Sequence, residues 1–354
     1  MVRSVKIWLD ALTPKQAMLF GSMYHELVLH GYSALLTARN YEYTTAVLKQ
    51  LGVNFVAIGG YGYDLKSKLV EELKRMLSLL DTIESFDALI AYPNPGAARV
   101  AFALQKHYIA LTDSPHSEIP SRLSLPLASA VVISSCIPKK LIDQYVFEGK
   151  TYIIQYNGVD EVQWLKDFKP DKAYLKSLDL DEYSYIVVRP PEIMASYYKN
   201  GIVVNQLIEK IIQYFINQGL SIVYLPRYDH DAIISMFGGM KNFIIPSTEV
   251  GVKGPQLLYH AVASISGGGT MAREAALIGT LGISLFPQEL CVDTCLQKKG
   301  FPISHLLSFE SIVEKIKESL RDVERYKKEA LITLQTLEKP ISGVLKVFEA
   351  LNLV

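Results

Sequence analysis

Cysteine is scarce in this chain, and neither sign of charge is in excess. Three cysteines among 354 residues are an odd count, which is typical of reduced thiols in a core rather than of a disulfide framework. Thirty-six basic residues balance thirty-six acidic ones. This balance argues against bulk nucleic-acid binding, which needs a basic surface, and leaves room only for a local basic patch.

Long apolar runs are also absent. The stretch 123–137 is interrupted by Ser and Pro and falls short of a membrane span. The first ten residues have a strand pattern rather than the architecture of a signal peptide. We therefore expect a cytoplasmic protein without a transmembrane segment, for which peripheral membrane contact remains open.

A third absence concerns cofactors. The first strand is not followed by a G-x-G-x-x-G motif, and Arg39-Asn40 end the second strand. A dinucleotide-binding enzyme usually has glycines at the first position and an acidic residue at the second. We expect neither a nicotinamide cofactor nor any other.

Short apolar runs alternate with amphipathic ones along the whole chain, and 49% of the residues are apolar. Such alternation predicts parallel sheets covered by helices on both faces. In the first half the expected strands are 5–9, 33–36, 54–58, 88–91, 108–111, 130–134 and 152–154. In the second half they are 185–188, 221–225, 243–245, 261–265 and 282–285.

The chain is long enough for two domains. A charged stretch at 158–183 interrupts the alternation and marks the best boundary. We expect an α/β protein with two doubly wound, Rossmann-like domains facing a cleft, at 1–160 and 180–339. A last helix within 340–354 is expected to pack back on the first domain.

Three glycines stand at the most informative position. Gly267, Gly268 and Gly269 follow an apolar run, and Thr270 leads into a helical run. Bare backbone N–H groups and a helix N-terminus together suit a phosphate or pyrophosphate. The late position of this loop predicts a nucleotide held by the second domain.

Charged residues near that loop are candidates for the rest of the nucleotide site. Arg189 and Arg227 end neighbouring strands and could clamp phosphate oxygens, although single arginines at strand ends more often form surface ion pairs. On the helix after the glycines, Arg273 is a further candidate, and Glu274 could accept hydrogen bonds from ribose hydroxyls or simply complement the helix dipole.

Candidates for proton transfer lie in the first half. Asp10 ends the first strand, where a carboxylate could act as a general base or support the loop. Asp113 and His116 follow the fifth strand, and a capping Asp beside a surface His is an equally good interpretation of that spacing. Spacing alone leaves these alternatives open.

Several segments together resemble a mainly archaeal family known only as a domain of unknown function. This family is placed with the glycosyltransferase-B (GT-B) enzymes and the UDP-N-acetylglucosamine 2-epimerases. The resemblance covers positions 7 to 287 and is carried by IWLDALTPKQAMLF, LLTARN, VAIGGYG, PGAARVAFAL, LTDSPHSEIPSRLSLPLA, VVRPPEIMASYY and GPQLLYHAVASISGGGTMAREAALIGTLGISLFP.

The resemblance implies roles for the glycine loop. The lipid-linked N-acetylglucosaminyltransferases of peptidoglycan synthesis bind UDP in their second domain through a glycine-containing loop and a Glu on the following helix. The segment from Gly267 to Thr270, with Glu274, matches that arrangement. The epimerases are similar there, but their first domain has a His-Gly-Asp motif where this chain reads Tyr92-Pro93-Asn94-Pro95-Gly96, without a carboxylate.

These observations together predict a metal-independent glycosyltransferase of the GT-B type. It would transfer a sugar from a nucleoside-diphosphate sugar, UDP-linked, to an unknown acceptor that is lipid-linked or soluble. The base would be Asp10 or, failing that, Asp113 or His116. Two alternatives are a UDP-N-acetylglucosamine 2-epimerase-like enzyme and a non-catalytic nucleotide-sugar-binding partner of a membrane enzyme.

Overall fold

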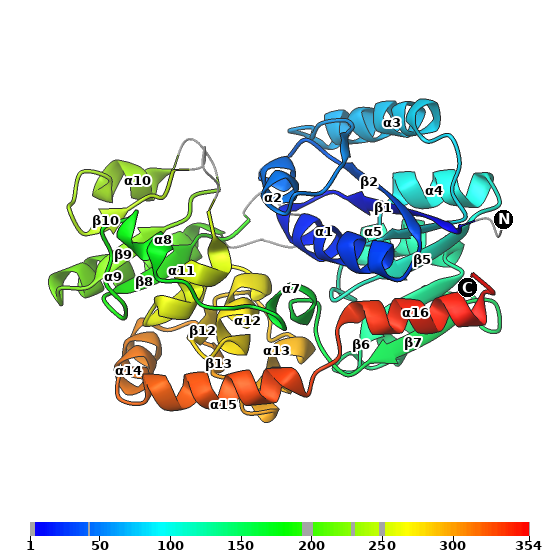
Figure 1. The fold of residues 1–354 in the computed structure, drawn as a ribbon. Coiled ribbons are helices and arrows are strands. Elements are labelled where there is room, and N and C mark those ends of the chain that lie inside the picture. The colour runs from blue at the N-terminus through cyan, green and yellow to red at the C-terminus, as the bar shows by residue number, and fades with distance from the viewer. Residues whose placement is uncertain (1–3, 42, 193–200, 228–230, 248–251, 354) are drawn as a thin grey trace. The chain divides into compact units, whose positions relative to one another are not determined.

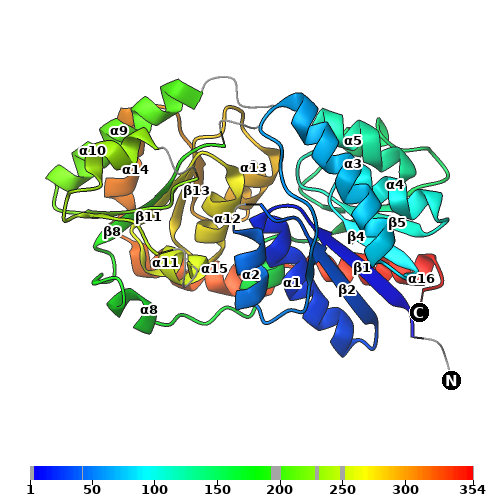
Figure 2. The same cartoon turned by 90° about the horizontal axis from the view of Figure 1, so that it is seen from above.

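The computed structural model describes residues 4–41, 43–192, 201–227, 231–247 and 252–353, and it divides into two compact units (Figures 1 and 2). Unit 1 comprises Met1–Trp164 and Glu338–Val354, and unit 2 comprises Leu165–Leu337. Each unit is built on its own parallel sheet, one of seven strands and one of six. The predicted α/β class with two doubly wound sheets is therefore confirmed.

The sheet of unit 1 has the strand order β3-β2-β1-β4-β5-β6-β7. Its strands are β1 (Lys6–Ala11), β2 (Ser33–Ala38), β3 (Val56–Ala57), β4 (Ala88–Ala91), β5 (His107–Leu111), β6 (Ala130–Ser134) and β7 (Tyr152–Tyr156). The order reverses between β1 and β4. In such sheets this switch point marks where the loops at the carboxyl ends of the strands diverge and ligands bind.

Helices cover both faces of this sheet. They are α1 (Pro14–Leu29), α2 (Thr44–Gln50), α3 (Leu65–Thr82), α4 (Pro95–Ala103), α5 (Glu118–Ser124), the 3₁₀ helix η1 (Leu125–Leu127), α6 (Lys140–Asp143), α7 (Val162–Leu165) and α16 (Pro340–Ala350). The C-terminal helix α16 packs on β6 and β7 (Figure 1).

Alternating residues of β1 explain the two layers of the core. Ile7 and Leu9 join a cluster formed with α1 and α16. Trp8 points the other way, where its ring contacts Phe86 at 5.0 Å between centroids. Every β1 residue from Ile7 to Ala11 is buried, as in parallel sheets covered on both faces, and Asp10 is the one charged residue among them.

The first helix begins as the sequence indicates, with one difference. The Thr13 hydroxyl accepts a hydrogen bond from the Gln16 backbone N–H at 3.4 Å, and Pro14 fills the first helical position. The Gln16 side chain, however, accepts from the N–H of Leu12 at 2.7 Å rather than from that of Thr13. The two side chains therefore cap backbone groups at the start of α1 without forming a reciprocal capping box.

The sheet of unit 2 has the order β10-β9-β8-β11-β12-β13. Its strands are β8 (Tyr185–Arg189), β9 (Ser221–Tyr224), β10 (Phe243–Ile244), β11 (Ala263–Ser266), β12 (Leu281–Ser284) and β13 (Ile303–His305). Its helices are α8 (Ala173–Lys176), α9 (Gly201–Asn217), α10 (Ala232–Phe237), α11 (Gly254–His260), α12 (Gly269–Leu277), α13 (Cys291–Lys298), α14 (Phe309–Ser319) and α15 (Val323–Gln335).

Two further expectations can be compared with the structure. Within the described ranges, no helix combines the length and apolar character needed to cross a bilayer. The three cysteines, Cys136, Cys291 and Cys295, are each partly exposed, so the expectation that they are buried in a core is wrong.

Candidate functional site

Polar side chains from three segments of unit 1 gather around the ammonium of Lys15, which lies on a fourth. Lys15 lies in the first turn of α1, directly after the capped start of that helix. Its Nζ is 2.5 Å from Oδ2 of Asp113 and 2.8 Å from Oδ2 of Asp160. It also lies 2.9 Å from the Tyr92 hydroxyl. We name these four residues the Lys15 cluster.

Topology explains why these residues meet. Tyr92 is the first residue after β4, Asp113 is the second after β5, and Asp160 lies in the loop after β7. Parallel strands end at the same edge of a sheet, so the loops after them converge there. The N-terminus of α1 lies at that edge too, because α1 follows the carboxyl end of β1.

The two carboxylates of the cluster differ in their surroundings. Asp160 is 3% exposed and accepts hydrogen bonds from the hydroxyls of Tyr92 and Tyr156, the latter at 2.7 Å. Asp113 is more exposed and accepts from the Ser114 hydroxyl at 2.8 Å. Asp113 is therefore the carboxylate better placed to reach a reactant, with Lys15 beside it as a charge partner.

Asp10 belongs to a different network. It is fully buried, and its two oxygens accept from both terminal nitrogens of Arg75, at 2.5 and 3.0 Å. The Thr37 hydroxyl and the Asn94 amide also donate to it, each at 2.5 Å. A buried carboxylate with four hydrogen-bond donors around it is typical of a residue that holds loops in place. Loop support was one of the two roles that the sequence suggested for Asp10. His116 is exposed on the turn before α5.

In unit 2 the strand order reverses between β8 and β11, and the glycine loop lies at this switch point. Arg189 is the register partner of Ser266 across the two strands. The Gly267 N–H donates to the carbonyl of Arg189 at 3.0 Å. Ligands of doubly wound sheets bind outside the carboxyl ends of strands at this kind of position.

The three glycines have three different surroundings. A Cβ on Gly267 would come within 2.3 Å of the Pro191 backbone, and one on Gly269 would come within 2.3 Å of the Arg273 guanidinium. A Cβ on Gly268 would meet no heavy atom within 4 Å in the described part of the chain. The first and third glycines therefore permit packing within unit 2, while Gly268, the N-cap of α12, has no such close neighbour among the described residues.

The other predicted nucleotide-binding residues divide into two groups. Arg189, Thr270 and Glu274 are partly exposed around the glycine loop. Arg227 donates to the carbonyl of Pro190 at 2.9 Å and to Glu192 at 3.3 Å, so it holds the loop after β8.

Arg273 belongs to the packed interior. It is 2% exposed and pairs with Asp293 of α13 at 3.1 Å. This ion pair ties α12 to α13, and the structure gives Arg273 a role in holding the loop rather than in lining open space.

Lys15 and Asp160 were not among the residues predicted from the sequence. The signal for Lys15 was its place in the first turn of a well-capped helix after β1. Asp160 lies in the charged stretch taken as a domain boundary, where its charge does not stand out. Tyr92 was noted only as part of a proline-rich turn.

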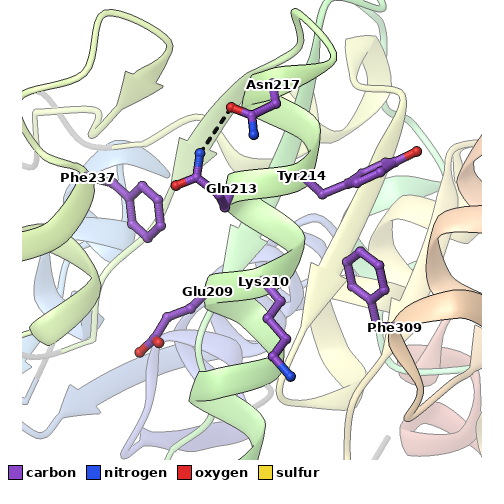
Figure 3. Close-up of a pocket in the computed structure, with 7 residues that line it drawn as sticks. All are labelled: Glu209, Lys210, Gln213, Tyr214, Asn217, Phe237 and Phe309. Carbon is purple, nitrogen blue, oxygen red and sulfur yellow. Dashed lines mark hydrogen bonds between the residues drawn. The ribbon is translucent and has the colours of Figure 1, made fainter.

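A shallow depression lies elsewhere in unit 2, on the surface of α9 (Figure 3). Along α9 the Gln213 amide donates to Asn217 at 3.0 Å, and Tyr214 of α9 meets Phe309 of α14 edge-on at 5.5 Å between centroids. The remaining lining residues are Glu209, Lys210 and Phe237. No predicted site residue lines it, and it is an open helix surface.

Comparisons with known proteins extend these observations. A family model described as a protein of unknown function (DUF354) matches residues 5–352. An uncharacterized protein of Methanocaldococcus jannaschii, MJ0665, is 29% identical over 330 residues, which are 90% of this chain and 92% of that protein.

Solved structures share the fold at low identity. The UDP co-structure of MnaA from S. aureus matches with a TM-score of 0.72 and 13% identity, over 99% of this chain and 98% of that one. The UDP-GlcNAc 2-epimerase of M. jannaschii, in complex with UDP-GlcNAc and UDP, matches with a TM-score of 0.67 and 14% identity, over 93% and 98%. The glycotransferase of kitacinnamycin matches with a TM-score of 0.58 and 10% identity, over 98% and 99%.

Proposed function

This chain belongs to the family described as a protein of unknown function (DUF354), and we propose that it is an enzyme acting on a UDP-linked sugar. The proposal assigns the nucleotide to the glycine loop of unit 2. The observation that carries it is the combination of a switch point, a helix N-terminus and a glycine, Gly268, whose Cβ position is free of described neighbours. Two of the structures with the same fold are described with UDP bound.

The chemistry of the loop supports a diphosphate as the bound group. The first backbone N–H groups of α12 have no partner within the helix and carry its positive dipole end. Arg189 adds a full positive charge at the neighbouring strand end. Such groups stabilise a departing diphosphate without moving during the reaction.

The reaction we propose is glycosyl transfer, with the acceptor assigned to unit 1. The acceptor oxygen forms a bond to the anomeric carbon as the bond from that carbon to the diphosphate breaks. The electron pair of the broken bond leaves with the diphosphate, and the acceptor proton passes to the carboxylate of Asp113. Lys15, 2.5 Å from that carboxylate, holds it in position at the sheet edge.

A specific observation favours epimerisation as the second candidate. The proline-rich turn lacks the carboxylate of the epimerase motif, yet the fold brings Asp160 to the hydroxyl of Tyr92 in that same turn. The Lys15 cluster thus supplies two carboxylates and an ammonium, enough for proton removal and return at a sugar carbon. Several of the solved structures with this fold are described as UDP-GlcNAc 2-epimerases.

Binding is tested first, by thermal shift of the full chain with UDP, UDP-GlcNAc and, as controls, ADP and GDP. A ligand at a hundred times its Kd stabilises a fold by about 2.7 kcal/mol, so UDP compounds should raise the melting temperature and the controls should not. If no uridine nucleotide shifts the melting temperature at about 1 mM, where even weak sites are occupied, the nucleotide assignment is wrong.

Turnover is tested next, with UDP-GlcNAc alone and then with polyprenyl phosphate and simple sugar acceptors. Release of UDP that depends on an acceptor supports transfer. If UDP-GlcNAc is converted to its manno epimer in the absence of an acceptor, the enzyme is an epimerase and not a transferase. If the protein binds UDP-GlcNAc tightly but catalyses neither reaction, both proposed activities are wrong, and the protein is a non-catalytic nucleotide-sugar-binding partner.

Asp113→Asn separates the base from the nucleotide site. It should lower turnover by roughly a hundredfold or more, the range for loss of a general base, with UDP affinity unchanged. Glu118→Gln is the matched control, because Glu118 is exposed and pairs with Arg122 on the surface of α5. Full activity in Asp113→Asn would transfer the role of base to another residue.

A further inference from the structure

Helix α3 of unit 1 exposes a row of large apolar side chains along its outer side. Their exposed fractions lie between 39% and 87%, and they are Leu65, Leu69, Val70, Leu73, Leu77 and Leu80. At 100° per residue these positions fall within an arc of about 140°. We name this row the α3 stripe.

The opposite side of α3 is held firmly against the sheet. Arg75 reaches through to Asp10 and donates to the carbonyl of Ile58 at 2.9 Å, and Leu79 is fully buried. At the N-terminus Asp64 and Ser67 form a complete capping box. The α3 stripe is therefore a preformed surface on a rigid helix, and α3 is seen at the rim of unit 1 in Figures 1 and 2.

The size of the stripe is that of an interface core. Its six side chains expose apolar area on the order of 500 Å², at the upper end of the largest patch on a typical monomer. Interface cores are about 65% apolar, so a contact centred on this stripe would bury roughly 800 Å² on each side. A stable complex of standard size buries about 800 Å² per partner.

We propose that the α3 stripe is the contact between two copies of this chain, packed antiparallel about a two-fold axis at Leu73. With that axis, Leu73 meets its own copy, and Leu69 lies opposite Leu77 of the second copy. Leu65 lies opposite the end of the stripe at Leu80. The row is thus self-complementary, as an isologous interface requires.

Charge at the two ends of the stripe fits the same pairing. Lys66 is exposed in the first turn of α3, and Asp81 is exposed in the last. An antiparallel contact brings the first turn of one copy to the last turn of the other, so each Lys66 would face an Asp81. Counted with the capping Asp64, four acidic residues balance the four basic ones of α3, and Arg75 among the latter is buried against Asp10. Attraction to an anionic membrane needs an exposed basic excess instead.

Sedimentation equilibrium of the full chain tests this contact. We expect the parent protein to be a dimer and Leu73→Glu to be a monomer with an unchanged circular-dichroism spectrum, because two carboxylates would meet on the axis. Leu29→Glu is the matched control, since Leu29 is 85% exposed on α1 outside the stripe, and it should remain dimeric.

A charge exchange gives a second, independent result. Lys66→Glu should weaken the dimer several-fold, and adding Asp81→Lys should restore it. A monomeric parent protein, or an unchanged dimer in Leu73→Glu, would overturn the proposal. So would a monomer that binds vesicles of phosphatidylglycerol through the stripe, which would make a membrane the partner instead.

Discussion

Asp10 and Arg75 form a bidentate ion pair beneath the sheet edge of unit 1, with Oδ1–Nη2 at 2.5 Å and Oδ2–Nη1 at 3.0 Å. Both side chains are almost completely buried. The pair ties β1 to α3, and Asn94 extends the tie to α4, because its amide donates to Asp10 while its oxygen caps that helix. The end of β1 is thereby fixed in front of Lys15.

This relationship leads to the first prediction, a loss of stability. Asp10→Asn leaves the buried Arg75 guanidinium without its counter-charge, and breaking one side of a buried pair costs about 3–5 kcal/mol. Urea unfolding of the variant should show that loss, while Glu118→Gln should unfold like the parent protein. A variant of unchanged stability that has lost turnover would make Asp10 a catalytic group after all.

Much of the fold could be predicted because its strands are fully buried. The expected strands at 88–91 and 130–134 agree with β4 and β6 to the residue, since continuous apolar runs bounded by polar turns are a strong local signal. Strand β13 was not predicted. Its three residues follow Phe301-Pro302 and are too short to show any periodicity.

The site was less accessible to sequence reasoning, for reasons of distance along the chain. The position of the glycine loop after a strand is a local pattern, so it could be read directly. Lys15 meets Asp160 across 145 positions of sequence, and only the strand order brings them together. Arg227 looked like a phosphate ligand, but its contact with Glu192 depends on two loops that sequence alone does not pair.

The second prediction separates the two arginines at the strand ends of unit 2. Arg189→Ala should weaken UDP binding by roughly tenfold or more, since hydrogen bonds to charged groups contribute about 1.5–3 kcal/mol. Arg227→Ala should mainly lower the melting temperature of the unliganded protein, because Glu192 and the Pro190 carbonyl lose their donor. The test is calorimetry with UDP and melting curves for both variants. If both lost UDP affinity equally and kept the melting temperature of the parent protein, the two arginines would clamp the phosphates together, as the sequence predicts.

The third prediction distinguishes neighbouring glycines. Gly268→Val should fold normally and abolish UDP binding, because its side chain would enter the space where a phosphate would approach the backbone. Gly267→Ala should instead destabilise the protein, because its Cβ would overlap the Pro191 backbone. UDP titration and melting curves for both variants give the test, and normal UDP affinity in Gly268→Val would contradict the proposed phosphate site.

The fourth prediction concerns Lys327, which is buried beneath the amino-terminal edge of the second sheet. Its Nζ donates to the Thr280 hydroxyl at 2.9 Å and to the carbonyl of Tyr259, over whose ring it lies at 4.0 Å from the centroid. Burial lowers the pKa of this ammonium from its usual 10.5 to about 7, and the charge of Glu182 offsets only part of that effect.

The sign of the resulting pH dependence follows from proton counting. Between about pH 7 and pH 10.5 the unfolded chain holds a proton on Lys327 that the folded chain has released. The free energy of unfolding should therefore rise with pH in this window, by at most about 1.4 kcal/mol per unit. Lys327→Met should remove this slope, whereas Lys328→Met, an exposed neighbour on α15, should keep it. The measurement is urea unfolding from pH 7 to pH 10. If the free energy of unfolding changed with pH in the same way in the parent protein and in Lys327→Met, Lys327 would be charged in the folded state.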